Sequence, residues 1–327
     1  MLRTAESVSP RHPDKLCDQI SDAILDEALR HDPYTRAGIE TVGGHGKVFV
    51  TGEMTFNGQV DTEQIVRRFV GPDAGITVHI AEQSREIAGG VDTGGAGDQG
   101  IMVGYATTAT PALMPLEVWL ARDLNRRLYE RWPNDGKTQI TVNDGRISAV
   151  VATFQNSSSP ALAGAVRDWL RDKEVDDGVR IHINPAGEWR QGGFDADAGL
   201  TGRKLAVDNY GPHIPVGGGA FSGKDASKVD RSAAYMARKL AVDYLRQLGA
   251  AETYVHLAYA IGVAEPVHAE VVADGRKVPV RGYDLTPRGI TEYLDLRRPQ
   301  FEQTAAYGHF GNGFRWDLLP QAAVVPN

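Results

Sequence analysis

The sequence predicts an α+β protein made of three successive units, each with helices that cover one face of a sheet. Apolar residues repeat with a helical period in some segments and alternate as in strands in others, and this mixture occurs three times along the 327 residues. A hydrophobic content of 42% in a chain of this length suffices for two or three cores. We place the domains at residues 1–94, 95–190 and 191–327, and we expect them to exchange strands.

A four-residue repeat of apolar side chains predicts an amphipathic helix over residues 14–31. Pro13 stands just inside its start, where the missing N–H of proline costs nothing. The repeat consists of Leu16, Ile20, Ile24 and Ala28.

The rest of the first unit is predicted as strand, helix, strand and loop. Residues 47–56 and 75–81 have strand-like patterns. Between them, Asp61 and Gln64 form a weaker version of the capping box and predict a helix start. Residues 83–100 are rich in glycine and lack periodicity, so we expect a mobile loop there.

The middle unit combines two helices with a hairpin. Leucines in helical register predict a helix over residues 116–128, and a second helix follows Pro160. Strand patterns at 138–142 and 146–154 flank Asn-Asp-Gly, which predicts a hairpin turn. A short strand then ends at Asn184.

The last unit opens with glycine-rich loops over residues 192–223, followed by a helix over residues 229–248 with one apolar face. Further strands and a helix that starts at Thr286 complete the unit. In all three units we expect antiparallel strand pairs packed against helices.

Charge and composition exclude several classes of function. Lys and Arg total 35 against 42 Asp and Glu, and the resulting charge of −7 argues against a nucleic-acid groove. Cys17 is the only cysteine, so neither an internal disulfide nor a zinc site built on thiols is expected. Apolar stretches are far shorter than the roughly 20 residues that cross a bilayer, and residues 1–10 lack a secretory pattern. We expect a cytoplasmic protein without membrane or nucleic-acid partners.

Two short segments carry candidate site residues near glycine or a helix start. His-Pro-Asp-Lys at residues 12–15 stands at the start of the first helix. The partial positive charge and free N–H groups of a helix start favour phosphate binding, and Asp14 can hold hydrated Mg²⁺. An ordinary helix cap explains the same residues in isolation. Gly-Ala-Gly-Asp-Gln-Gly at residues 95–100 places Asp98 among glycines that let a ligand approach, although a plain turn has the same composition.

A third segment, Gly-Gly-Gly-Ala-Phe-Ser-Gly-Lys-Asp at residues 217–225, nearly matches the phosphate loop of nucleotidases. Asp225 stands where that loop has a Ser or Thr for Mg²⁺, and residues 212–216 are not a convincing strand. A glycine-rich phosphate contact is therefore compatible with this segment, and a P-loop fold is not.

Cations and acids gather around the third segment, as a polyphosphate with bound metal requires. The residues alone indicate Mg²⁺-nucleotide chemistry. An ordinary solvated surface has the same mixture of charges, so this alternative stays open. The cations are Arg203, Lys204, Lys224 and Lys228, and the acids are Asp197 and Asp230.

Taken in order, these motifs resemble the methionine adenosyltransferase family, and the likeness runs from residue 7 to residue 310. Further long matches are Asp-Gln-Ile-Ser-Asp-Ala at 18–23, Ser-Lys-Val-Asp-Arg-Ser-Ala-Ala-Tyr at 227–235, Tyr-Ala-Ile-Gly-Val-Ala-Glu-Pro at 259–266 and Thr-Ala-Ala-Tyr-Gly-His-Phe-Gly at 304–311. The resemblance implies three similar α+β domains around a pseudo-threefold axis. It also implies that two subunits pack their sheets together and share active sites, as a homodimer or a dimer of dimers.

The resemblance further implies synthesis of S-adenosylmethionine from L-methionine and ATP. The methionine sulfur would attack the 5′ carbon of ATP, and the released triphosphate would be hydrolysed to pyrophosphate and phosphate. A thioether needs no base, so the enzyme would align the substrates and stabilise the departing charge. The implied cofactors are Mg²⁺, two per site, and K⁺.

Site residues follow from the resemblance position by position. Asp14 and Asp230 would bind Mg²⁺, and Glu40 would hold K⁺. The catalytic residues would be His12, Lys137, Arg203, Lys204 and Lys224. ATP binding would involve these five and also Trp189, Asp197 and Ala220. The methionine side would consist of Glu53, Gln83, Asp98, Asp197 and Lys228, and residues 84–95 would form a loop that closes over the site.

The sequence departs from the family pattern at a few positions. Arg11 stands where Gly usually precedes the His-Pro-Asp-Lys motif, and Trp189 occupies the place of a Phe that stacks on adenine. The chain is also shorter than is usual. Two alternatives to the synthetase are a kinase or ATPase, against which the failed P-loop match argues, and a non-catalytic binder, against which the retained acids and cations argue.

Overall fold

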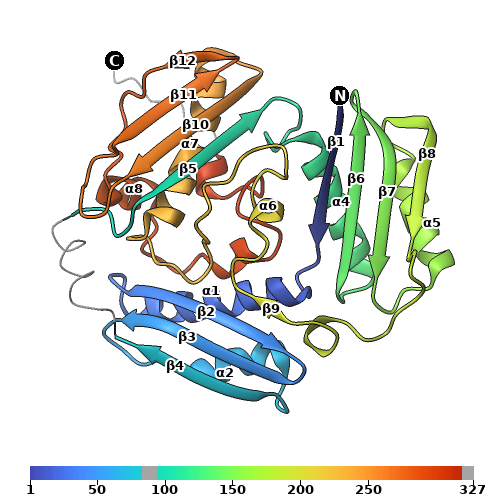
Figure 1. Cartoon of the computed structure of the whole chain (residues 1–327), viewed down its shortest axis with the longest axis horizontal. Coiled ribbons are helices and arrows are strands. Elements are labelled where there is room, and N and C mark those ends of the chain that lie inside the picture. Colours follow the sequence, from blue (N-terminus) through green and yellow to red (C-terminus); the bar gives the residue numbers. More distant parts are fainter. Residues whose placement is uncertain (83–93, 319–327) are drawn as a thin grey trace, which may run out of the picture.

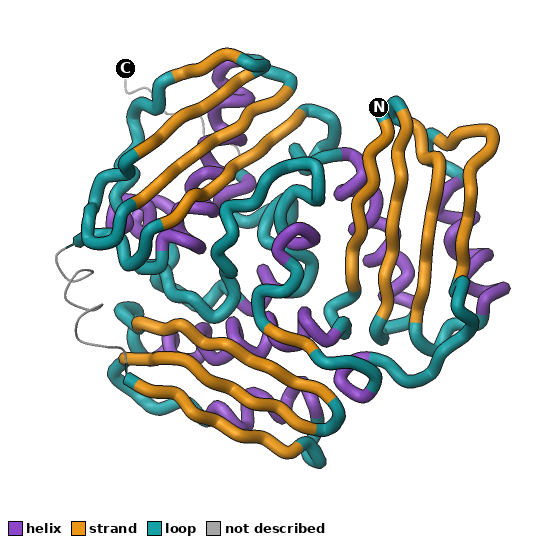
Figure 2. The backbone as a smooth tube through the Cα atoms, in the orientation of Figure 1, coloured by secondary structure: helices purple, strands orange, loops and turns teal. Residues whose placement is uncertain are grey.

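Three four-stranded sheets, each backed by helices, surround a common centre (Figure 1). The computed structural model describes residues 1–82 and 94–318. Within these residues the fold is α+β and falls into three units, as predicted. Figure 2 shows that much of the backbone at the centre, between the sheets, is loop.

The first sheet has the strand order β4-β3-β2-β9 and is covered by two helices. Ala37 and Ile39 of β2 alternate with exposed positions and pack against the first helix, so this sheet buries one face. The strands are β2 Arg36–Gly44, β3 Lys47–Thr55, β4 Gly75–Ala81 and β9 Gly199–Leu200, and the helices are α1 Pro13–His31 and α2 Thr62–Val70.

The second sheet has the order β1-β6-β7-β8. A separate core fills the space between this sheet and its helices, with Phe154, Ile140 and Leu124 fully buried. The strands are β1 Leu2–Val8, β6 Gly136–Asn143, β7 Arg146–Phe154 and β8 Val175–Ile183, and the helices are α4 Leu116–Arg131 and α5 Ser159–Leu170.

The third sheet has the order β12-β11-β10-β5 and packs against the long helix α7. The strands are β5 Gly100–Thr107, β10 Glu252–Tyr259, β11 His268–Ala273 and β12 Arg276–Val278, and the longer helices are α7 Val229–Leu248 and α8 Pro287–Leu294. The single turn α6 Leu205–Asp208 lies between the sheets, near the centre (Figure 1).

Three strands lie in the sheet of a unit other than their own. β1 pairs with β6, β5 pairs with β10, and the two-residue β9 pairs with β2. The domain boundaries at 94/95 and 190/191 stay a prediction. The pairings nevertheless mean that no stretch of about 100 consecutive residues contains one complete sheet with its helices.

The predicted elements occur close to their expected positions, and each unit contains an antiparallel pair as expected: β2 with β3, β6 with β7 and β10 with β11. Two further pairs, β3 with β4 and β7 with β8, are parallel and were not predicted. In each case a helix, α2 or α5, separates the two strands along the chain and provides the crossover that a parallel pair needs. The predicted helix cap is confirmed, since Asp61 Oδ1 accepts the Gln64 N–H at 2.9 Å.

The central helices α1 and α7 bury charged side chains as well as apolar ones. Asp18 and Asp22 on α1, and Arg231 and Arg238 on α7, are each at most 1% exposed. A buried charge must be paired, so these residues fix how the helices and loops at the centre meet. In the described parts of the chain, no helix combines the length and apolar character needed to cross a bilayer.

Candidate active site

The first group of site residues surrounds the start of α1. His12 is the N-cap residue, and its Nδ1 accepts the Asp14 N–H at 3.2 Å. Pro13 follows at the first helical position, as predicted. Since Nδ1 is an acceptor, the proton of the neutral ring is on Nε2, which can donate to a ligand.

Burial and then the nearby Lys204 ammonium lower the pKa of His12 to about 3. The ring is therefore uncharged at neutral pH. The charge of Lys137 on β6 acts on His12 in the same direction, so this lysine belongs to the same group, although its Nζ also lies 3.6 Å from Glu6 Oε2.

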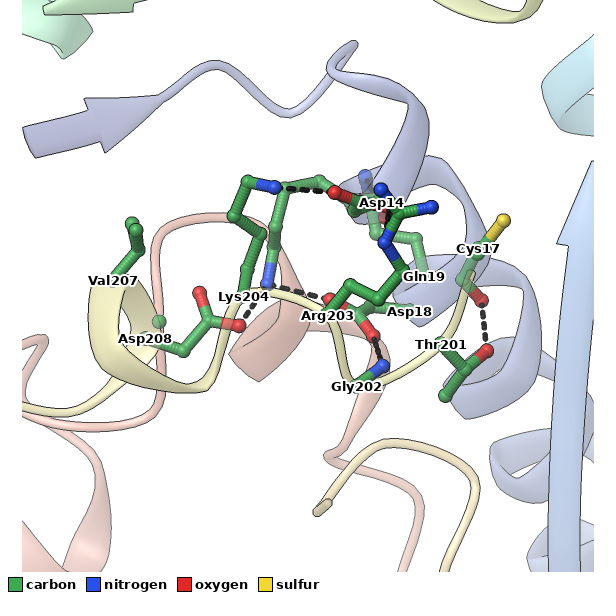
Figure 3. Close-up of polar contacts among 12 residues, drawn as sticks. Asp14, Cys17, Asp18, Gln19, Thr201, Gly202, Arg203, Lys204, Val207 and Asp208 are labelled. Carbon is green, nitrogen blue, oxygen red and sulfur yellow. Dashed lines mark hydrogen bonds and ion pairs between the residues drawn. The ribbon is translucent and has the colours of Figure 1, made fainter. Parts of the chain in front are cut away.

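Asp14 is the buried acid of this group, and two cations face it. Its Oδ1 accepts the Leu200 N–H at 3.0 Å and lies 3.5 Å from Arg203 Nε, and its Oδ2 pairs with Lys204 Nζ. Burial alone would raise the pKa of Asp14, but the bonds from Lys204 and Leu200 outweigh burial and lower it. The carboxylate is thus ionised and is held between helix and loop (Figure 3).

A buried set of charges holds the Arg203–Lys204 loop against α1. The Gly202 N–H donates to Asp18 Oδ1 at 2.8 Å (Figure 3). Lys15 Nζ bridges Asp18 Oδ2 at 3.0 Å and Asp208 Oδ2 at 2.7 Å. A Cβ at Gly199 would lie 2.2 Å from the Pro13 carbonyl oxygen, so the loop approaches the helix as closely as glycine allows.

Two further predicted ATP ligands, Trp189 and Asp197, lie in the segment between β8 and β9. The half-buried Trp189 ring packs over Gly192, where a Cβ would come within 2.7 Å of Trp189 Cζ3. Asp197 is exposed, and its charge contributes to raising the pKa of Asp135, after the larger effect of burial.

The second group surrounds the start of α7. Lys224 Nζ lies 2.5 Å from Asp230 Oδ2. Lys228 Nζ donates to Asp225 Oδ2 at 2.7 Å and lies 3.9 Å from Glu53 Oε1. The segment at 217–225 is not preceded by a strand, and α7 begins only at Val229, so a P-loop is absent from this described region.

Glycines pack tightly around Asp230 in this second group. A Cβ at Gly219 would lie 2.3 Å from Asp230 Oδ1, and one at Gly100 would lie 3.3 Å from it. Ala220, a predicted ATP ligand, contacts the first group's loop, because a Cβ at Gly202 would lie 2.7 Å from Ala220 Cβ. The two loops therefore touch, although their ion pairs form separate groups.

Two other predicted site residues, Asp98 and Glu40, are exposed to solvent. Asp98 is exposed just before β5, and Glu40 is exposed on β2, opposite Thr51 in the strand register. Gln83 and most of the predicted loop at 84–95 lie outside the described residues. Asp14 and Asp230 belong to different groups, and in the described part of the chain no three His, Cys, Asp or Glu side chains are arranged to hold a metal.

Sequence reasoning missed several charged residues at these groups. We treated Asp225 only as the residue that breaks the P-loop match, whereas it holds Lys228. Asp18, Asp22, Asp208 and Arg231 were likewise not singled out. In the sequence they look like ordinary polar positions, and their partners lie up to 209 residues away.

Comparison with known proteins matches all three parts of this architecture. Residues 1–84, 93–189 and 191–318 match the N-terminal, central and C-terminal domains of S-adenosylmethionine synthetase, respectively. The chain belongs to the S-adenosylmethionine synthetase family. The recognition made from the motifs is thus confirmed, and it extends over almost the whole chain.

Curated relatives from this family align along nearly their full length. The S-adenosylmethionine synthase of Desulforudis audaxviator is 43% identical over 383 aligned residues, which cover 98% of this chain and 96% of the relative. The S-adenosylmethionine synthases of Bifidobacterium adolescentis and Myxococcus xanthus are 41% and 43% identical and cover 97% and 98% of this chain (95% and 93% of the relatives). These alignments are longer than the 327-residue chain, so they contain gaps in it.

Proposed function

We propose that this protein is a methionine adenosyltransferase that forms S-adenosylmethionine from L-methionine and ATP, with release and later cleavage of the whole triphosphate. Family membership supports the overall activity. The observation that carries the mechanism is the first group, in which a neutral His12 and the cations Arg203 and Lys204 surround the start of one helix.

The reaction expels a highly charged triphosphate, so stabilising that charge is the main task of the site. His12 Nε2–H would donate to the oxygen that leaves the 5′ carbon, because Nδ1 is already occupied by the Asp14 N–H. Because the His12 ring is neutral, its N–H is not engaged in an ion pair and is available to the leaving oxygen. Lys137, Arg203, Lys204 and, from the second group, Lys224 would neutralise the phosphate oxygens.

Alignment of the two substrates would be the second task of the site. Trp189 would stack on adenine, with Asp197 and Ala220 as further ATP contacts. Glu53, Asp98, Asp197, Gln83 and Lys228 would surround methionine. The ammonium of Lys228, held between Asp225 and Glu53, offers a fixed positive charge that fits a carboxylate.

Two Mg²⁺ ions, when bound, would neutralise the part of the triphosphate charge that the lysine and arginine side chains do not. The donors fit this role: Asp14 and Asp230 are single carboxylates beside cations, and Mg²⁺ commonly takes one or two carboxylates plus substrate phosphates. Glu40 would hold K⁺ on the exposed face of β2. Its other ligands would have to come from elsewhere.

We also propose that two copies complete each site. Asp14 and Asp230 would both serve one triphosphate, yet within one chain they belong to different groups. The open face of the first sheet supports an interface, because Val42 and Phe49 stand opposite each other in the register of β2 and β3 and are 40% and 39% exposed. Packing this face against a second copy would bury them, in a dimer or a dimer of dimers.

The test is methionine-dependent formation of S-adenosylmethionine. Purified protein with ATP, L-methionine, Mg²⁺ and K⁺ should give a product with the mass of S-adenosylmethionine, and omission of methionine should abolish it. Formation of ADP with no adenosylated product would instead make the protein a kinase or ATPase. Binding of both substrates without any product would make it a non-catalytic relative.

A further inference from the structure

A fully buried ion pair joins the two central helices behind the second group. Arg231 Nη1 donates to Asp22 Oδ1 at 2.6 Å, and Arg231 Nη2 donates to Asp22 Oδ2 at 2.8 Å. The side chains are 1% and 0% exposed. Asp22 lies in the middle of α1, and Arg231 lies in the first turn of α7, directly after Asp230.

The same two side chains hold the backbone that carries Lys224. Asp22 Oδ1 also accepts the Gly223 N–H at 2.8 Å, and Arg231 Nη1 also donates to the Lys224 carbonyl oxygen at 3.0 Å. The other guanidinium donors reach Thr304 Oγ1 at 3.2 Å and the Tyr235 hydroxyl at 3.0 Å. The planar guanidinium of Arg231 therefore uses its N–H donors on the Asp22 carboxylate, the Lys224 carbonyl, Thr304 and Tyr235.

The opposite side of this segment is held by strand β2. The Ile39 N–H donates to the Gly223 carbonyl oxygen at 3.0 Å. Gly223 has a φ of +83°, and a Cβ there would lie 1.9 Å from the Ile39 carbonyl oxygen, so only glycine fits. Residues 223 and 224 are thus clamped between β2 and the ion pair, and the Lys224 side chain extends from a fixed backbone to Asp230.

We propose that Asp22 and Arg231 are positioning residues, which set the Lys224 ammonium and the Asp230 carboxylate at the spacing that the triphosphate site needs. Neither residue touches substrate, because both are buried. The proposal rests on the proposed function. Lys cannot replace Arg231 in this role, since one ammonium cannot bind both Asp22 oxygens, the Lys224 carbonyl and the Tyr235 hydroxyl at once.

The same helix provides a matched control. Arg238 lies seven residues further along α7, is fully buried, and pairs with Asp317 at 2.9 Å. Its guanidinium also donates to the carbonyl oxygens of Tyr105, Ala112 and Leu113. It therefore resembles Arg231 in burial and in having one acidic partner, with four hydrogen bonds against five, but its partners lie outside residues 217–230.

The experiment compares Arg231→Lys with Arg238→Lys by thermal unfolding and by steady-state kinetics of S-adenosylmethionine formation. Both variants should lose thermal stability. Arg231→Lys should lower kcat about 100-fold, the scale of a misplacement of about 1 Å, while Arg238→Lys keeps kcat within about threefold of the parent. Equal losses of kcat in the two variants would reduce Asp22 and Arg231 to structural residues and overturn the proposal.

A second variant keeps the test decisive if Arg231→Lys does not fold. The double variant Asp22→Asn/Arg231→Gln removes both charges together, so no unpaired charge stays buried. It should fold and still show the loss of kcat, and near-parent kcat in this variant would refute positioning.

Binding of inorganic triphosphate, measured by calorimetry, separates this proposal from the proposed function. Affinity should fall in Arg231→Lys and not in Arg238→Lys, whether or not the parent makes S-adenosylmethionine. A parent without turnover that still shows this difference would sink the proposed function alone. Equal affinities in both variants would sink the positioning role alone.

Discussion

Lys224 Nζ lies 2.5 Å from Asp230 Oδ2, and this contact joins the glycine-rich segment to the first turn of α7. Asp14 and Lys204 form a comparable pair at the start of α1. In both cases a carboxylate that would bind Mg²⁺ is directly paired with a cation that would bind phosphate. In the proposed reaction, Asp14 and Asp230 would each exchange their lysine partner for Mg²⁺, and Lys204 and Lys224 would turn to the phosphate oxygens.

The first prediction is that Asp14→Asn and Asp230→Asn each abolish measurable turnover. An amide is a much poorer Mg²⁺ ligand than a carboxylate, and loss of one well-placed group at the leaving charge typically costs about 3–4 kcal/mol of barrier. Turnover is measured at ordinary Mg²⁺ concentration. Asp177→Asn, at an exposed position on β8, is the control and should retain parent activity. Near-normal activity of either site variant would remove that residue from the site.

The second prediction concerns the sharing of sites between two copies. Neither variant alone should turn over, but an equal mixture of Asp14→Asn and Asp230→Asn chains, dissociated and reassociated, should recover about a quarter of parent activity. Half of the dimers are then mixed, and in each of these one of the two symmetric sites is intact. If both aspartates of a site came from one chain, the mixture would stay inactive.

The third prediction concerns pH and follows from His12. Its pKa is about 3 in the folded protein, below the ordinary value of 6.5, so between these values the unfolded chain binds a proton that the folded chain does not. Stability should therefore be full above pH 6.5 and should fall as the pH decreases. From pH 7 to pH 5 this residue alone should remove about 1–2 kcal/mol.

His12→Asn provides the comparison for this effect, because Asn also caps helices but does not titrate. The free energy of unfolding is measured in urea at pH 7 and pH 5 for the parent and the variant. The variant should lose less stability than the parent over this interval. The same loss in both proteins would mean that His12 is charged in the folded state or does not contribute.

The helices of the first unit could be predicted from the sequence, because local patterns of residues suffice to predict a helix and its start. Pro13 and the four-residue repeat predicted α1 to within one residue, and Asp61 predicted the start of α2. The parallel β3–β4 and β7–β8 pairs were not predicted, since alternation along one strand carries no information about the sense of its neighbour. Strand exchange such as that of β1 with β6, which pairs Val8 with Lys137 and Leu2 with Asn143, joins residues far apart in the chain and has no local signal.

Some site residues could be found from sequence motifs, and others could not. Motifs brought Asp14, Arg203 and Lys204 to notice, and the structure places them together. The Asp22–Arg231 pair was missed, because both residues look like ordinary polar positions of their helices and their pairing spans 209 residues. Such pairs become visible only when the burial of both helices is known.

The fourth prediction tests the K⁺ assignment. Glu40 is exposed on β2 and is expected to act through the ion rather than on substrate. Added K⁺ should stimulate the parent and not Glu40→Gln, with Glu63→Gln on α2 as an exposed control that retains the stimulation. Activity is measured with and without KCl at constant ionic strength. Equal stimulation of the parent and Glu40→Gln would withdraw the assignment.

Displacement of the whole triphosphate of ATP by methionine separates a methionine adenosyltransferase from a kinase or ATPase, and phosphorus NMR of the complete reaction measures it. With ATP, L-methionine, Mg²⁺ and K⁺, we expect the ATP signals to be replaced by pyrophosphate and phosphate in equal amounts, with no ADP, and we expect no consumption of ATP when methionine is omitted. Appearance of ADP as the phosphorus product, with or without methionine, would refute displacement of the whole triphosphate.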